Sequence, residues 1–210
     1  MRSGLGCAVA GLVCLTFAAG GPAQAATLTD GDTYGSWRVV FAGYGSVTAT
    51  PSKLTLQPAV ATTADTTHAA LVVGTSQTNV RLKTRVTLNA QLRTGSSANP
   101  WETGWLVTRY QDPEHFYYVA LKTNGWELGK RDPAYPGGQR FLATGDTPAA
   151  EEGASQQVAL TASGNKISVR IDGEAVTTFT DTQRPYRSGA VGFYAEDAAV
   201  TFDKISVASL

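Results

Sequence analysis

The residues best suited to chemistry gather between positions 101 and 131, where aromatic rings alternate with charged and amide side chains. Seven of the chain's Phe, Trp and Tyr residues fall within positions 101–126 alone. Sugar rings stack their C–H faces on aromatic planes, and their hydroxyls need paired donors and acceptors. We therefore expect a carbohydrate-binding surface here. The expected contact residues, from this stretch and its flanks, are Arg85, Trp101, Arg109, Tyr118, Lys122, Trp126, Glu127 and Gln139.

Core packing is the alternative interpretation for some of these rings. Successive strand residues point to opposite sides of a sheet, so alternation divides the segment HFYYVALK at 115–122 into two faces. We expect Tyr117, Val119 and Leu121 to pack in the core, and Tyr118 and Lys122 to face a ligand. The other rings expected to pack in the core are Trp105 and Phe116.

Arg109 and Trp126 complete the expected surface. Arg109 lies four residues after Trp105, so strict alternation puts both on one face. An arginine on an apolar face needs an anion or a ring as partner. The structural partner would be Asp112 or Glu127, and the functional one a glycan carboxylate or hydroxyl. Alternation leaves the face of Trp126 undecided.

An enzyme acting through the same face is the second hypothesis. A lyase of uronate-containing glycans needs a cation that neutralises the carboxylate and a base that removes the adjacent proton. The neutralising cation would come from Arg85, Arg109 and Lys122, and the base from His115, Tyr118 and Tyr194. A glycoside hydrolase is the other enzyme alternative, although its paired carboxylates would have to come from isolated acids such as Glu114 and Glu127.

Many short strands must position these residues. Strand-type runs recur along the chain, no segment keeps an apolar period of about 3.6 residues, and turn dipeptides such as Asn124-Gly125 and Asp172-Gly173 separate the runs. About thirteen strands of this kind predict an all-β fold, a two-sheet antiparallel jelly-roll sandwich. We expect the Gly- and Pro-containing loops at 95–104 and 132–139 to lie beside the binding surface.

Residues 1–25 are typical of a signal peptide, with Arg2 at the start, an apolar stretch and the small-residue site Ala23-Gln24-Ala25. We therefore expect a secreted, extracellular protein whose residues 26–210 form a single domain. The apolar stretch is shorter than the roughly 20 residues that span a bilayer. Both cysteines, Cys7 and Cys14, lie inside it, which excludes disulfides and thiol catalysis in the mature chain.

Charge narrows the range of partners. Without Arg2 the mature chain has 16 Lys and Arg (17 less one) against 17 Asp and Glu, a formal charge near −1. This balance argues against nucleic acid and against an anionic membrane surface. The expected partner is a polysaccharide or oligosaccharide, bound by a monomer without membrane insertion and without an essential cofactor.

Three segments carry a resemblance to a known family: GWLVTRYQDPEHFYYVALKTNGWELGKRD (104–132), IDGEAVTTFTD (171–181) and SGAVGFYAEDAAVTFDKISV (188–207). They resemble the concanavalin A-like lectin and glucanase superfamily, especially secreted bacterial jelly rolls similar to laminin-G-like domains and 3-keto-disaccharide hydrolases. The resemblance implies two antiparallel sheets with a concave face that meets carbohydrate. The Glu-x-Asp-x-x-Glu strand of laminarinase-type hydrolases and the Gln-x-His strand of jelly-roll lyases are absent, and only Tyr194 matches the lyases' Tyr-Asn-Gln.

The same resemblance implies a structural calcium held by oxygen ligands from the N-terminal region and the last strand. Asp30, Asp32 and Asp203 could supply those ligands; the alternative is that they are solvated or cap turns. No two histidines stand at metal-ligand spacing, so a catalytic zinc is not expected.

Overall fold

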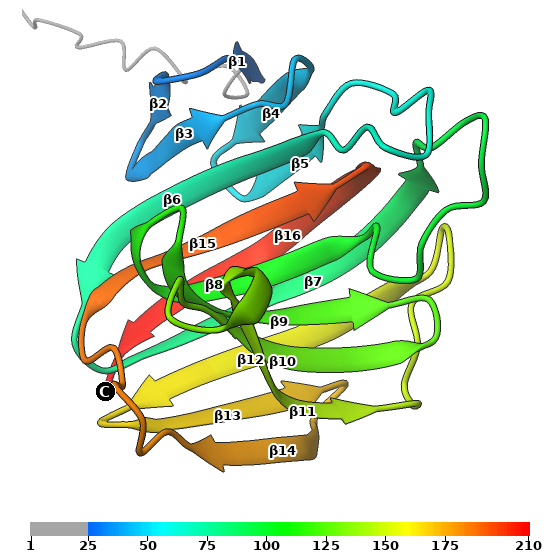
Figure 1. The fold of residues 1–210 in the computed structure, drawn as a ribbon. Coiled ribbons are helices and arrows are strands. Elements are labelled where there is room, and N and C mark those ends of the chain that lie inside the picture. Colours follow the sequence, from blue (N-terminus) through cyan, green and yellow to red (C-terminus); the bar gives the residue numbers. More distant parts are fainter. Residues whose placement is uncertain (1–24) are drawn as a thin grey trace, which may run out of the picture.

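Two antiparallel sheets of eight strands each stack face to face in the computed structural model, which describes residues 25–210 (Figure 1). The expected signal peptide and both cysteines lie outside the described residues, apart from Ala25. The predicted all-β, two-sheet antiparallel sandwich is confirmed. Within residues 25–210, no helix has the length and apolar character needed to cross a membrane.

The first sheet, called sheet A, lies at the back in Figure 1. Its strands, in spatial order, are β1 (Ala26–Leu28), β4 (Ser46–Thr50), β5 (Lys53–Gln57), β16 (Ala198–Ser209), β7 (Val80–Gln91), β12 (Ser155–Ser163), β13 (Lys166–Ile171) and β14 (Glu174–Thr180). The short strands β1 and β4 were not expected from the sequence.

The second sheet, called sheet B, carries the stretch singled out above. Its strands, in spatial order, are β11 (Gln139–Gly145), β10 (Gly125–Arg131), β9 (His115–Lys122), β8 (Gly104–Asp112), β15 (Gly189–Glu196), β6 (Ala69–Gln77), β3 (Trp37–Phe41) and β2 (Thr33–Tyr34). A short 3₁₀ turn, η1 (Pro136–Gly138), interrupts the loop between β10 and β11.

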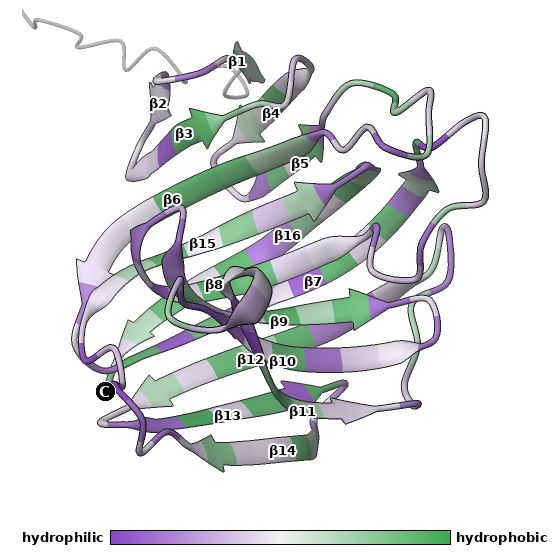
Figure 2. Ribbon diagram, in the orientation of Figure 1, coloured by the Kyte–Doolittle hydropathy of each residue, from purple (hydrophilic) through white to green (hydrophobic). Residues whose placement is uncertain are grey.

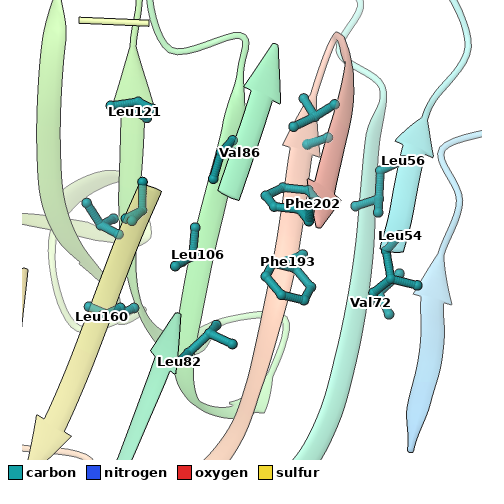
Figure 3. Packing of buried hydrophobic residues seen from close by; sticks show 14 of the residues in the cluster. Leu54, Leu56, Val72, Leu82, Val86, Leu106, Leu121, Leu160, Phe193 and Phe202 are labelled. Carbon is teal, nitrogen blue, oxygen red and sulfur yellow. The ribbon is translucent and has the colours of Figure 1, made fainter. Parts of the chain in front are cut away.

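The core lies between the sheets and takes apolar side chains from both. Hydrophobic residues alternate with more hydrophilic ones along many of the strands (Figure 2). Leu106 and Phe193 of sheet B face Leu82 and Phe202 of sheet A (Figure 3). The rings of Phe193 and Phe202 stack across the interface with centroids 4.5 Å apart. Each such buried side chain stabilises the fold by about 1.5–3 kcal/mol, so this layer fixes the sheet on which the site is built.

The division of β9 into two faces is confirmed. Tyr117, Val119 and Leu121 belong to the core between the sheets. Tyr118 packs in a second cluster on the outer face of sheet B. The expectation that Trp126 lies on that outer face is wrong: its indole is in the core and donates to the carbonyl of residue 147 at 2.9 Å.

The expected position of Arg109 is also wrong, because a bulge interrupts the alternation of β8. The pairing of β8 with β9 shifts register between Thr108 and Asp112, and Arg109 adopts a left-handed φ of 56°. Tyr110 takes the outer-face position beside Trp105 that strict alternation gives to Arg109. The fully buried guanidinium of Arg109 instead donates to backbone carbonyls of loops, among them those of residues 164 and 187.

Candidate functional site

A cavity of about 520 Å³ lies on the outer face of sheet B. Seven strands of sheet B and the loop before β8 contribute to its wall. Its rings are Phe41, Trp101, Trp105, Phe116, Phe141 and Tyr194, and its polar side chains are Lys122, Glu127, Arg131, Gln139 and Glu196. The mixture of rings with forked donors and acceptors is the one that the sequence predicted for this sheet.

The floor of the cavity is one row of cross-strand neighbours. Glu127 of β10 pairs with Ala120 of β9, which pairs with Trp105 of β8, which pairs with Tyr194 of β15. Neighbouring strands lie about 4.8 Å apart, so Glu127 and Tyr194 stand roughly 14 Å apart along this row. Ala120 carries only a methyl group, and this leaves a depression between the carboxylate and the indole.

Trp105 lies between two tyrosines. Its ring centroid is 4.7 Å from that of Tyr118 on one side and 4.7 Å from that of Tyr194 on the other. The indole N–H donates to the backbone carbonyl of Trp101 at 3.0 Å, which ties the ring to the loop before β8. These contacts place Trp105 on the outer face, although the sequence predicted it in the core. Phe116, the other ring predicted in the core, also lies on the outer face and lines the cavity. Trp101 itself is 43% exposed, so a ligand can cover this ring.

Tyr118 lies under the acidic side of the cavity. Its hydroxyl donates to Glu127 Oε1 at 2.6 Å and accepts a hydrogen bond from the amide of Gln139. Burial raises the pKa of Tyr118 far above its ordinary value, and the charge of Glu127 acts in the same direction. Tyr118 is therefore a neutral hydrogen-bond donor that orients Glu127, and a poor candidate for the base of a lyase.

Glu127 also meets a cation. Lys122 Nζ lies 3.6 Å from Glu127 Oε2, and both side chains are only partly exposed. Since Tyr118 holds one oxygen and Lys122 approaches the other, the carboxylate is fixed in direction. It can still accept hydrogen bonds from sugar hydroxyls, while Lys122 and Gln139 can donate to them.

A second carboxylate stands at the opposite end of the row. The hydroxyl of Tyr194 donates to Glu196 Oε2 at 2.7 Å. Burial raises the pKa of the Glu196 carboxyl above its usual range; the charges of Asp197 and Glu102 add to this effect, and the Tyr194 hydrogen bond opposes it. When ionised, Glu196 is therefore a stronger base than an ordinary carboxylate.

A buried ion network supports this end of the cavity. Arg93 donates to Glu102 Oε1 and to Asp197 Oδ2, each at 2.6 Å, and all three side chains are almost completely buried. Asn99 adds a hydrogen bond of 2.7 Å to the same oxygen of Glu102. The network connects the loop that carries Trp101 to the β15–β16 turn directly after Glu196. It therefore holds Trp101 and Glu196 in fixed positions beside the cavity.

Several predicted site residues lie elsewhere. Arg85 is on the outer face of sheet A, where it forms two hydrogen bonds of 2.6–2.7 Å with Asp203. His115 stands at the end of β9, and its Nδ1 pairs with Asp112 at 2.8 Å. Neither lines the cavity, nor do Trp126 and Arg109. The structure brings together Trp101, Lys122, Glu127, Gln139 and Tyr194, with Tyr118 beneath them.

The acids expected to bind calcium do not meet. Arg85 occupies both oxygens of Asp203. Asp30 Oδ1 accepts the amide of Ala42 at 2.7 Å, and Asp32 Oδ2 accepts the amide of Thr29 at 2.9 Å, so both cap turns. Over residues 25–210, no group of three or more His, Cys, Asp or Glu is placed to hold a metal ion. The residues proposed from the sequence therefore do not fit a calcium site.

Sequence reasoning missed Glu196, Arg131 and Phe141 as cavity residues. A signal existed for Glu196, because it follows Tyr194 by two positions and so shares its face. Arg131 likewise follows Glu127 by four positions, an even step that keeps both on one face, on the strand whose faces were undecided. Nothing in the sequence indicated that Phe141, which is 66% exposed, faces this cavity.

Comparisons with known proteins agree with the fold. The model of the 3-keto-alpha-glucoside-1,2-lyase-like domain matches residues 24–208. The chain is similar to the carbohydrate-binding module CBM66 from Bacillus subtilis (15% identity, TM-score 0.58, 83% of this chain and 96% of that chain). It is also similar to a putative glycosyl hydrolase from Parabacteroides distasonis ATCC 8503 (12% identity, TM-score 0.51, 78% and 90%). A third similar structure is the exoplasmic/lumenal domain of VIP36 in its Ca²⁺/Man3GlcNAc-bound form (13% identity, TM-score 0.56, 88% of each chain). A search of curated proteins found no significant match.

Proposed function

Because the chain belongs to the 3-keto-alpha-glucoside-1,2-lyase-like family and has a concanavalin A-like fold, we propose that it binds carbohydrate in the cavity of sheet B. One observation carries the proposal. Trp105 is held between two tyrosines, each of which donates its hydroxyl to a glutamate of the cavity wall. Apolar ring faces and fixed acceptors are thus combined in one hollow, as sugar rings and their hydroxyls require.

The charges of the cavity favour a neutral sugar. Glu127 and Glu196 carry two carboxylates, and Lys122 and Arg131 carry two cations, so the lining has no net charge at neutral pH when all four are ionised. Lys122 is already engaged by Glu127, which leaves it poorly placed to neutralise a uronate. The cavity volume of about 520 Å³ lies within the usual range of small-molecule sites.

Export and assembly belong to the same proposal. Residues 1–25 have the pattern of a signal peptide, and a secreted protein would meet extracellular polysaccharide or the oligosaccharides released from it. We propose that the mature chain acts as a monomer, with the face of sheet B that carries the cavity serving as the expected concave binding face.

Glycan binding by purified residues 26–210 tests this proposal. We expect the protein to bind neutral oligosaccharides on a glycan array, with titration calorimetry giving the affinity of the best ligand. Trp101→Ala should weaken binding roughly fivefold to tenfold, because one stacked ring is worth about 1–1.4 kcal/mol. Glu127→Gln should weaken binding at least as much, because it removes charge-assisted hydrogen bonds.

Glu174→Gln is the matched control, because Glu174 is an exposed glutamate of β14 in sheet A. This variant removes the same charge as Glu127→Gln, but at a position on the other sheet. Its affinity for the glycan should therefore equal that of the original protein. Absence of binding to every neutral glycan, or equal losses in all three variants, would refute the proposed site.

A second candidate function is β-elimination on a 3-keto glucoside, which the raised pKa of Glu196 favours. In such a sugar the C3 carbonyl makes the proton on C2 acidic. The Glu196 carboxylate would remove this proton, and the C–H electron pair would become a C1–C2 double bond. The glycosidic C1–O bond breaks, and the departing alcohol keeps its electron pair and receives the proton that Glu196 removed, either directly or through water.

The nitrophenyl glycoside of 3-keto-α-glucose tests this reaction. Turnover would release nitrophenolate together with a conjugated enone that absorbs ultraviolet light, and Glu196→Gln should abolish both signals. Release of nitrophenolate without the enone would indicate hydrolysis. Release of neither would leave the cavity as a binding site only.

A further inference from the structure

A second hollow adjoins the cavity of sheet B and has no part in the function proposed above. It has a volume of about 590 Å³ and lies between the β3–β4 turn and the segment that leads into β6. Phe41 lines both hollows. In the register of sheet B, Phe41 pairs with Leu71, which pairs with Tyr194 in the floor of the main cavity. The same cross-strand row therefore runs from one hollow into the other.

Tyr44 is the unusual residue of the second hollow. Its side chain is 95% exposed, and its backbone adopts a left-handed φ of 59°. Glycine or asparagine is better suited to this conformation than a bulky aromatic residue. Gly43 and Gly45 on either side pack so closely on neighbouring backbone that neither has room for a Cβ, which fixes the turn. A disfavoured, exposed tyrosine on a fixed turn has no evident packing role and points to a contact with a ligand.

His68 supplies a hydrogen-bond acceptor beside this ring. Its Nδ1 lies 3.1 Å from the carbonyl oxygen of Ala59, and a carbonyl can only accept, so Nδ1 carries the proton. In the neutral imidazole Nε2 is then an acceptor. The imidazole and the Tyr44 ring form a T-shaped pair with centroids 5.7 Å apart, so the acceptor lies beside the ring.

Asp30 supplies a second acceptor. Its Oδ1 accepts the amide of Ala42 at 2.7 Å, which anchors the carboxylate at the rim of the hollow. Within residues 25–210, Oδ2 takes part in no hydrogen bond or salt bridge and is free to accept from a ligand. The hollow thus combines a flat exposed ring with two acceptors and contains no cation, which suits the hydroxyls of a neutral sugar and disfavours an anionic one.

We infer that this second hollow is a further sugar subsite, in which one hexose unit of a neutral oligosaccharide stacks on Tyr44 while its hydroxyls donate to His68 and Asp30. The inference rests on the proposed function, because the preceding unit of the same oligosaccharide occupies the main cavity. The subsite extends recognition from a single sugar unit to a chain, with Phe41 between the two units.

Tyr44→Gly is the decisive variant, because glycine suits the left-handed backbone and should leave the thermal midpoint unchanged or raise it. The probes are immobilised α-linked and β-linked glucosides of one to six units, followed by calorimetry with the best series. Tyr44→Gly should bind the longer members roughly fivefold to tenfold more weakly and the single-unit members equally well, while Tyr44→Phe should retain binding because it keeps the ring. Glu127→Gln should weaken binding of every member.

The outcomes separate the two proposals. If the original protein binds glycans but Tyr44→Gly binds every length as well as the original does, the second subsite is refuted and the main site stands. An equal loss for one unit and for six units refutes it too, because a subsite affects only the chains that reach it. If the original protein binds none of these glucosides and no other neutral glycan on the array, the proposed function fails and this inference fails with it.

Discussion

Gly129→Ala tests how closely the site residues are packed, because Gly129 faces Tyr118 across β9 and β10. A Cβ at this position would overlap Cζ and Oη of Tyr118. Non-bonded carbon atoms pack at about 3.5–4.0 Å, so the ring would have to move by roughly an ångström or more. Trp105 on its face and hydrogen bonds to Glu127 and Gln139 oppose that movement.

The expected magnitude follows from this overlap. Forcing an extra methyl group into a filled site costs about 1–3 kcal/mol, and for a chain of this size each kcal/mol lowers the thermal midpoint by roughly 2–4 °C. We therefore expect a loss of about 2 kcal/mol and a midpoint lower by about 4–8 °C. Without the overlap, Gly129→Ala would stabilise the protein, because alanine is favoured over glycine inside a strand by about 0.5–1 kcal/mol.

Urea and thermal unfolding followed by circular dichroism measure the effect. The matched background is Tyr118→Ala, which removes the ring that the new methyl group would meet, so Gly129→Ala should there be neutral or stabilising. We expect a coupling energy of at least about 1.5 kcal/mol between the two positions. Unchanged or increased stability of the single Gly129→Ala variant would refute this account of the site.

Three further predictions concern charge. Glu196→Gln should raise the thermal midpoint at pH 8 and have no effect below about pH 4. The reason is that a carboxyl whose pKa is raised in the folded state destabilises the fold only once the pH exceeds its pKa in the unfolded chain. A difference in midpoint that is independent of pH would contradict this prediction. Lys130→Met should cost about 3–5 kcal/mol in urea unfolding, because Lys130 is fully buried 3.0 Å from Asp181, whose buried carboxylate would lose this partner. A loss under about 1 kcal/mol would show that Arg140, which lies 3.3 Å from the other oxygen of Asp181, compensates the carboxylate by itself. Calcium at about 1 mM should leave the midpoint unchanged, because Arg85 occupies Asp203, and a clear rise would reveal a site formed by other residues.

Alternation predicted the site where the strands are regular. The segment 115–122 divides as expected, and this placed Tyr118 and Lys122 on the functional face from sequence alone. Trp101 and Gln139 were also predicted at the cavity, because both lie in segments expected as Gly- and Pro-containing loops, which tend to carry binding groups beside an aromatic strand; in the structure Gln139 begins β11.

The failures have identifiable physical causes. Arg109 is misplaced because one left-handed residue shifts the register of β8, and nothing in the sequence marks a bulge at an arginine. Trp126 lies two positions before Leu128 on β10, and both side chains pack in the core between the sheets. The aromatic and charged composition of this segment had instead favoured an exposed ring. Arg85 was predicted to contact carbohydrate but lies on sheet A, where it pairs with Asp203, because alternation gives a face and not the sheet to which a strand belongs.

The uneven exposure of the four tryptophans gives the protein a built-in optical reporter. Trp105 and Trp126 are at most 7% exposed and Trp37 is partly buried against the core, whereas Trp101 is 43% exposed at the mouth of the cavity. Emission at long wavelengths and quenching by dissolved acrylamide should therefore come chiefly from Trp101. A sugar that covers this ring should shift the emission to shorter wavelengths and protect it from the quencher, so occupancy of the cavity can be followed in solution without a label.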